Sequence, residues 1–297
     1  MTTHRWRVEA AGLDCSRPAF TVVELLVCVG VLAVLAGLIL PAIQASRSSA
    51  SRLACSDRLR QVTLASLSFT ETAGHFPVST DSRPPLILLG PYVEADGLDE
   101  DALDDRRSPP VYLCPADGQV SAANGEVSLR FNDGTGAVYA GYDGTAVPYR
   151  AKPTSPRLIT LADVTDGLSQ TALLSERLAD GDGDDRRAVL PCRISGPAIT
   201  PQLLRASCEE GVVGTVAEPE TAGGLLQREG YSHGRLPNSH SCYEEQTRFG
   251  VGNGLVSATS LHPGGVNVAY ADGRVVQTSD RIEADVWFAA GTRAAAD

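Results

Sequence analysis

The most conspicuous hydrophobic pattern lies near the start of the chain. From Leu25 to Ser46 there is no charged residue, and the stretch is rich in leucine and valine. About 20 helical residues cross the hydrocarbon core of a bilayer. Aliphatic side chains in such a run favour insertion by roughly 3 to 6 kcal/mol together. The pattern therefore predicts a transmembrane helix.

The helix is expected to continue beyond the membrane. Cys55, Leu59, Val62 and Phe69 recur at helical spacing, which predicts an apolar stripe on one face. Pro41 removes one backbone hydrogen bond and should bend the helix without ending it. A Gly-His-Phe-Pro sequence from residue 74 is typical of a helix end. We predict one bent helix over residues 20–72.

After residue 75 the pattern changes to short apolar runs separated by Gly, Pro and Asp. Such runs predict a mainly antiparallel β head with long loops. Alternating residues 266–271, followed by Asp272-Gly273 and another apolar run, predict a two-residue hairpin in which Tyr270 pairs with Val275. The overall prediction is an α+β fold with a long N-terminal transmembrane helix packed on this head.

Charge restricts the function. The formal charge is −11, with no compensating basic stripe, and this argues against a nucleic-acid partner. Loss of residues 1–19 would remove three arginines and two acids, which brings the charge near −12.

The cysteines contain no CxxC pair, so a zinc ribbon is not indicated. In an extracytoplasmic head, one or two disulfides and a free thiol are expected. Cys55 with Cys114 and Cys192 with Cys208 are candidate pairs. Free buried thiols are the alternative, and the sequence does not settle the connectivity.

Three interpretations of the N-terminal segment compete. A cleaved secretory signal has a shorter apolar region and a small-x-small cleavage site. A cut after Ala45 would place the large residue Ile43 at the third position before the cut, which fits that site poorly. A plain signal anchor is the second interpretation. The third starts from Glu24, an acid at the edge of the apolar run, where a carboxylate is unfavourable unless it finds a cation or the positive end of a helix.

The residues from Phe20 to Val27, Phe-Thr-Val-Val-Glu-Leu-Leu-Val, resemble the type IV prepilin cleavage and methylation signature. The resemblance implies that a prepilin peptidase cuts between Ala19 and Phe20, where Ala19 replaces the usual Gly. Glu24 then becomes the fifth mature residue, and Pro41 falls where pilin helices commonly kink. In assembly, the resemblance implies, Glu24 neutralises the Phe20 α-amine of a neighbouring subunit.

Four further landmarks resemble a large bacterial prepilin-type family of unknown function. They are Cys55 followed by Leu59-Arg60-Gln61, the Leu-Cys-Pro-x-Asp of residues 113–117, the Asp166-Gly167-x-Ser-x-Thr of residues 166–171, and His262 with nine residues before Asp272-Gly273. This last ending is written H-x9-DG. The landmarks occur in order along nearly the whole chain. The resemblance implies a pilin-like fold.

Other candidate sites also have structural interpretations. A strand over residues 266–271 would separate His262 from Asp272 by about 20 Å, so we expect His262 to bond nearby backbone and Asp272-Gly273 to make a turn. Asp180, Asp182 and Asp184 alternate as in a calcium loop, but Asp185 and Pro191 depart from the EF-hand pattern. A solvated loop is the alternative to a Ca²⁺ site there. No other metal or cofactor is expected.

These observations predict a leader (1–19), a transmembrane half-helix (20–46), a soluble half-helix (47–74) and an extracytoplasmic head (75–297). We expect a non-enzymatic, single-pass inner-membrane protein with its N-terminus in the cytoplasm and its head in the periplasm or on the cell surface. It would be a pilin- or pseudopilin-like subunit of a type II secretion or type IV pilus-like assembly. Its partners would be the prepilin peptidase and like subunits. A monomeric anchored binding module and an anchored hydrolase are the alternatives.

Overall fold

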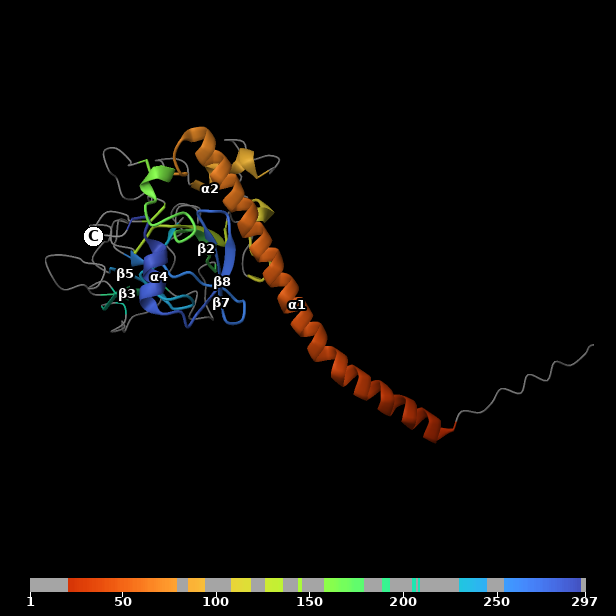
Figure 1. The fold of residues 1–297 in the computed structure, drawn as a ribbon. Helices are drawn as coiled ribbons and strands as arrows, with labels where there is room; N and C mark the ends of the chain where they lie inside the picture. Colours follow the sequence, from red (N-terminus) through yellow and green to blue (C-terminus); the bar gives the residue numbers. More distant parts are fainter. Residues whose placement is uncertain are drawn as a thin grey trace, which may run out of the picture. The chain divides into compact units, whose positions relative to one another are not determined.

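A computed structural model describes residues 21–78, 85–93, 108–118, 126–135, 144–145, 158–178, 189–192, 205–206, 208, 230–244 and 254–294 (Figure 1). The helices are α1 (Val22–Ala73), α2 (Pro85–Leu88) and α4 (Ala284–Gly291), with 3₁₀ turns η1 (Gly90–Tyr92), η3 (Pro110–Tyr112) and η6 (Leu161–Asp163). The strands are β1 (Leu129–Asn132), β2 (Ala172–Glu176), β3 (Val189–Cys192), β4 (Gly230–Tyr231), β5 (Ser241–Glu244), β6 (Gly254–Leu255), β7 (Gly265–Tyr270) and β8 (Val275–Ser279).

Helix α1 has a defined signal at each end. At the start, the Glu24 carboxylate accepts hydrogen bonds from the backbone N–H and the hydroxyl of Thr21, at 2.9 and 2.8 Å. The Thr21 hydroxyl oxygen in turn accepts from the Glu24 N–H, which completes a capping box. At the other end, Gly74 has φ +79° and its N–H bonds to the Thr70 carbonyl. The helix runs without interruption through Pro41.

The chain divides into two compact units, residues 1–48 and 49–297. In the described part of the first unit, the aliphatic side chains of α1 are exposed. Within the described residues, α1 is the one helix long and apolar enough to cross a membrane. A membrane anchor and a signal sequence share these properties.

The second unit contains a mixed five-stranded sheet in the order β4-β1-β2-β7-β8. Within it, β1–β2, β2–β7 and β7–β8 are antiparallel, and β1–β4 is parallel. A smaller sheet has the order β3-β5-β6, with β3–β5 parallel and β5–β6 antiparallel. The expected α+β fold with a long N-terminal helix is confirmed.

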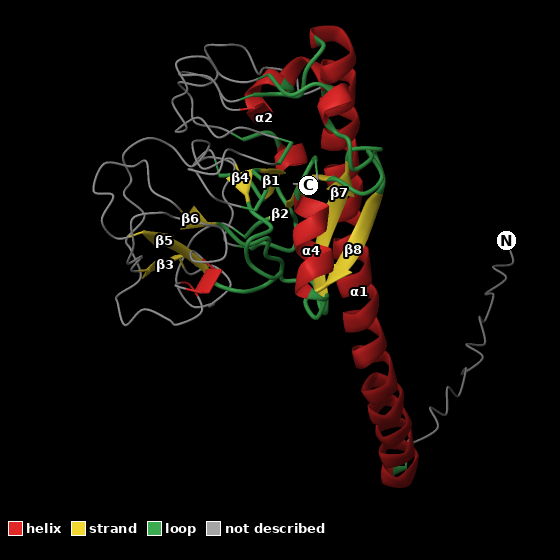
Figure 2. Cartoon of the chain, turned by 60° about the vertical axis from the view of Figure 1, so that its left-hand side comes forward, coloured by secondary structure: helices red, strands yellow, loops and turns green. Residues whose placement is uncertain are grey.

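Each face of the five-stranded sheet has its own hydrophobic core. One core joins Leu59, Val62 and Ala65 of α1 to the sheet, including Leu129, Phe131, Leu174 and Ala269. The other joins Trp287 of α4 to Tyr231, Val266 and Val268. Successive residues of β7 thus point to opposite cores, as the two-residue period of a strand requires. Figure 2 shows α1 and α4 beside the β7–β8 pair.

Buried polar groups tie α4 to the sheet. The amide nitrogen of Asn132 donates to the carbonyls of Ala172 and Gly291, at 2.8 and 2.9 Å, and its oxygen accepts from the Gly134 N–H. Asn132 is fully buried, so these three bonds leave its side chain satisfied. The C-terminal end of α4 is thereby attached to β1 and β2.

The β7–β8 hairpin differs by one residue from its prediction. Ala269 pairs with Val275, and the Tyr270 N–H donates to the Arg274 carbonyl. The loop is therefore three residues long, residues 271–273, with Gly273 at φ +89°. A turn followed by a glycine in this conformation is the usual three-residue hairpin, and the two-residue prediction was wrong.

A second glycine of this hairpin is required by close packing. A Cβ placed on Gly265, at the start of β7, would lie 1.9 Å from the Thr278 carbonyl oxygen of β8. Backbone atoms cannot yield without moving the strand pair. Any side chain at position 265 should therefore separate β7 from β8.

Candidate functional site

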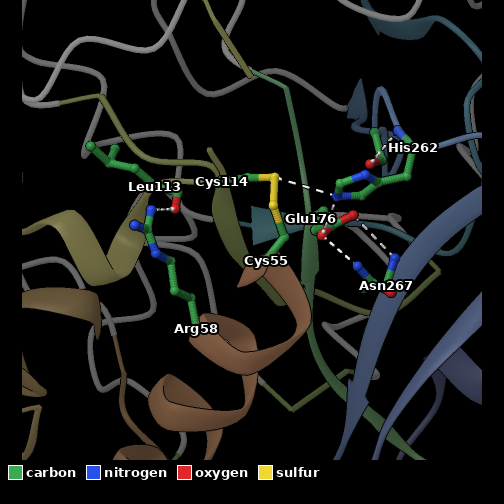
Figure 3. Close-up of a disulfide and its surroundings, with 8 residues drawn as sticks. Cys55, Arg58, Leu113, Cys114, Glu176, His262 and Asn267 are labelled. Carbon is green, nitrogen blue, oxygen red and sulfur yellow. Dashed lines mark hydrogen bonds and ion pairs between the residues drawn. A yellow bond between two sulfur atoms is a disulfide. The ribbon is translucent and has the colours of Figure 1, made fainter. Parts of the chain in front are cut away.

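A disulfide attaches α1 to the segment that follows η3. Cys55 and Cys114 are bonded, both are buried, and their Cα atoms lie 5.0 Å apart. One turn further along α1, the Arg58 guanidinium donates to the Leu113 carbonyl at 2.6 Å (Figure 3). The structure therefore holds the backbone beside Cys114 by a covalent bond and a hydrogen bond to the same helix.

A buried carboxylate lies next to this disulfide. Glu176 is the last residue of β2 and only 2% exposed. The Asn267 side-chain amide on β7 donates to Glu176 Oε1 at 2.7 Å, and the Asn267 backbone N–H donates to Oε2 at 3.2 Å. Both carboxylate oxygens are therefore oriented by one residue of the neighbouring strand.

His262 completes the cluster, just before β7. Its Nε2 lies 3.5 Å from Glu176 Oε1 and 3.6 Å from the Cys114 sulfur, and the residue is 3% exposed (Figure 3). We expected the ring to bond nearby backbone, but it faces a carboxylate and a disulfide. Its bond to a nearby residue comes from the backbone, since the His262 N–H donates to the Ser260 hydroxyl.

The donor atoms of Cys55, Cys114, Glu176 and His262 all lie within 4.8 Å of one another, and all four residues are buried. We call these four residues the disulfide cluster. Two sulfurs, an imidazole and a carboxylate are ligands of the kind that structural metal sites use. In the oxidised form the sulfurs are bonded to each other. The cluster can therefore undergo redox chemistry, in which the Cys55–Cys114 disulfide is reduced to two thiolates.

Asp272 and Gly273 lie at the far end of β7 and have a structural role, as expected. The Asp272 carboxylate accepts from the Arg274 N–H at 3.0 Å within the hairpin loop. A Cβ on Gly273 would come within 3.6 Å of the Leu67 side chain and 3.8 Å of Leu64, both on α1. The structure thus separates the two ends of the H-x9-DG segment: His262 joins the disulfide cluster and Gly273 lies against α1.

Asp166 and Gly167 anchor the end of the chain. The Asp166 carboxylate accepts from the Thr292 hydroxyl at 2.9 Å, and its N–H donates to the Arg293 carbonyl. Gly167 has φ +97° and its carbonyl accepts from the Gln170 and Thr171 N–H groups. This turn therefore fastens the residues after α4.

The remaining predicted residues divide into two groups. Glu24 is exposed at the start of α1 and Pro41 lies within that helix. Ala19 and Phe20, and the calcium candidates Asp180, Asp182 and Asp184, lie outside the described residues. The structure corrects the second cysteine pair, because Cys208 is bonded to Cys242 and not to Cys192.

Sequence reasoning missed Glu176 and Asn267. A signal for Glu176 was present, since it stands two positions after the apolar run Ala172-Leu-Leu in a short strand, where a carboxylate needs a buried partner. Asn267 gave less indication, because a polar residue in an alternating strand is ordinarily assigned to the solvent face.

The geometry defines a class of protein: a chain with one apolar N-terminal helix whose second half is fixed to an α+β head by a disulfide. More particularly, the chain belongs to the family described as protein of unknown function DUF1559 (SBP_bac_10), whose model matches residues 44–285. The match covers the C-terminal part of α1 and most of the unit formed by residues 49–297. No curated protein matches the chain, and no solved structure does.

Proposed function

We propose that this protein is a membrane-anchored, pilin-like subunit that a prepilin peptidase cuts between Ala19 and Phe20. The capping box of Thr21 and Glu24 carries the proposal, because it starts the helix immediately after that cut. The peptidase would release a chain that is helical almost from its first residue. The exposed apolar surface of the first helical turns supports insertion of that helix into the inner membrane.

Glu24 has a specific task in this proposal. Within one chain its carboxylate is satisfied by Thr21. In an assembly, the α-amine of Phe20 on a neighbouring subunit supplies a cation, and a carboxylate at the bilayer edge gains more from a cation than from a neutral donor. The capping box stabilises the monomer until that amine replaces Thr21. Assembly thus involves an exchange of partners at Glu24.

The mature N-terminus provides the direct test. Protein purified from membranes of a cell with a prepilin peptidase is analysed by mass spectrometry. The expected result is a chain that begins with N-methylated Phe20. An intact Met1, or a terminus near Ser46, would show that the segment is a plain anchor or an ordinary signal.

Assembly is tested separately with Glu24→Ala. Glu71 is an exposed acid on the same helix, and Glu71→Ala is the matched control. We expect Glu24→Ala to insert and to be cut but to lose subunit–subunit crosslinks, while Glu71→Ala keeps them. Normal crosslinking by Glu24→Ala would refute the assembly role. Correct processing with no crosslinks even in the unmodified protein would favour the monomeric anchored module.

Catalysis is not part of the proposed function. Two residues of a conceivable hydrolase triad have other partners, since the Asp166 carboxylate accepts from the Thr292 hydroxyl and His262 faces Glu176. A screen of the full chain against ester and peptide substrates, with His262→Ala as the comparison, tests this point. Turnover that His262→Ala abolishes would contradict the proposal.

A further inference from the structure

We propose that the disulfide cluster is a redox-dependent zinc site: after reduction of the Cys55–Cys114 bond, Cys55, Cys114, Glu176 and His262 bind one Zn²⁺ ion. The donor set is the first reason. Thiolate sulfur and imidazole nitrogen select Zn²⁺ over Ca²⁺ or Mg²⁺, and a carboxylate is an accepted fourth ligand. All four residues are buried, as in closed structural sites.

The distances between the donor atoms are the second reason. Zinc bonds of about 2.0–2.1 Å to nitrogen or oxygen and 2.3 Å to sulfur imply tetrahedral edges of about 3.4 Å for nitrogen to oxygen and 3.5 Å for nitrogen to sulfur. His262 Nε2 lies 3.5 Å from Glu176 Oε1 and 3.6 Å from Cys114 Sγ. Two edges of the tetrahedron are therefore already in place before a metal binds.

The sulfur–sulfur edge is the one that must change. Two zinc-bound thiolates lie about 3.8 Å apart, which follows from the same bond lengths. The four donor atoms already lie within 4.8 Å of one another, so after reduction the required change is a local separation of the two sulfurs. Cys55 lies on α1 and Cys114 on the segment after η3, so each sulfur can rotate independently of the other.

The surroundings of the cluster are those of a supported metal site. Asn267 donates to both oxygens of Glu176 and so fixes the direction of the carboxylate. Arg58 fixes the carbonyl of Leu113, next to Cys114. Bonds of this kind around the ligands raise metal affinity, because the ligands lose less freedom when the ion binds.

The two forms are connected by a balanced exchange. A dithiol reductant attacks one sulfur of the Cys55–Cys114 bond as a thiolate, and a mixed disulfide forms while the other cysteine leaves. The second thiol of the reductant then displaces the first cysteine and closes the reductant's own disulfide. Two electrons and two protons reach Cys55 and Cys114. Zn²⁺ releases those two protons when the thiolates bind it.

Cobalt provides a spectroscopic test on the full chain in detergent micelles. The protein is reduced with dithiothreitol, desalted under anaerobic conditions and titrated with Co²⁺. We expect one ion per chain in the cluster, with a thiolate-to-cobalt charge-transfer band and the strong visible bands of tetrahedral cobalt, and displacement of both by Zn²⁺. The oxidised protein should show neither band. A reduced protein that gives no tetrahedral thiolate spectrum refutes the proposal.

The second disulfide supplies a matched control. Cys208→Ala with Cys242→Ala should leave the cobalt spectrum unchanged, whereas Cys55→Ala with Cys114→Ala should abolish it. The opposite pattern would place the metal elsewhere and overturn the assignment.

Two milder variants keep the test independent of folding. With circular dichroism showing a folded chain, Asn267→Ala should weaken Co²⁺ binding by about 10- to 100-fold, because it removes the support of a ligand. His262→Gln removes a ligand itself and should weaken binding at least as much. Unchanged affinity in both would refute the assigned ligand set. Should reduction unfold the chain, recovery of the circular dichroism spectrum by Zn²⁺ supports the site, and failure to recover contradicts it.

Discussion

His233 is a buried base whose neutral form the structure requires. Its Nδ1 lies 2.6 Å from the Trp287 carbonyl, which can only accept, so Nδ1 carries the proton. Its Nε2, at 2.9 Å from the Tyr231 hydroxyl, then accepts from that hydroxyl. The ring also stacks on Trp287 with 3.9 Å between centroids. All hydrogen-bonding positions of the neutral imidazole are thus satisfied.

Burial lowers the pKa of His233 from 6.5 to about 3. Because the pKa of His233 is lower in the folded state than in the unfolded state, the unfolded chain binds the proton more readily. Stability is therefore unaffected above about pH 6.5 and falls as the pH decreases from 6.5 toward 3. Each pH unit in this interval removes about 1.4 kcal/mol, so the loss at pH 5 is about 2 kcal/mol.

The assay compares urea unfolding of the unmodified chain and His233→Asn in detergent micelles from pH 8 to pH 4. Asparagine cannot titrate, and its amide can still donate toward the Trp287 carbonyl. Trp287 is the sole tryptophan after residue 19, so in a chain that lacks residues 1–19 its fluorescence follows unfolding. The stability difference between the two proteins should shrink by about 2 kcal/mol between pH 8 and pH 5. A difference that does not vary with pH would refute the reasoning.

Three further substitutions test the packing of the head by urea denaturation. Gly265→Ala should lower the free energy of unfolding by more than about 3 kcal/mol, because its Cβ would meet the Thr278 carbonyl. The control Gly118→Ala has open space around its Cβ and should change the free energy of unfolding by less than about 0.5 kcal/mol. Equal effects of the two substitutions would contradict the close approach of β7 and β8. Replacing Cys55 and Cys114 by alanine should lower the free energy of unfolding by about 4 kcal/mol under oxidising conditions, because the disulfide closes a loop with a sequence separation of 59. An unchanged free energy of unfolding would show that the disulfide does not form. Asn132→Ala should cost about 3 kcal/mol because it leaves buried partners unsatisfied, and a change below 1 kcal/mol would argue against those bonds.

The sequence was sufficient for the features that depend on local pattern. The start and end of α1 followed from the polar-to-apolar change and from Gly74, within two residues of the predicted limits. Of the predicted apolar stripe, Cys55, Leu59 and Val62 are buried, and Phe69 is partly buried against the same core. These features are determined by residues close in sequence, and they are accessible without a structure for that reason.

Features that depend on distant residues were not accessible. Cys208 bonds to Cys242 on β5 and not to Cys192, and this pairing joins positions 34 apart in the sequence. His262 and Glu176 are separated by 86 positions, and no local pattern indicates that β2 and β7 are neighbours in the sheet. The hairpin error has a smaller cause, because Asp-Gly suits both a two-residue loop and the last two positions of a three-residue loop.

The nine-residue spacing between His262 and Asp272 acquires a geometric explanation. Strand β7 has six residues and spans about 20 Å. At one end His262 reaches the disulfide that begins at Cys55, and at the other Gly273 lies against Leu67, twelve residues further along α1. Twelve helical residues span about 18 Å. The strand and the helix segment therefore have matching lengths and run in the same direction. A segment longer or shorter by two residues would keep the same strand face toward α1, yet it would contact the helix at only one end. The spacing thus matches the distance between the two positions on α1 that the segment contacts. This match explains why a histidine and a glycine turn that do not contact each other form one motif.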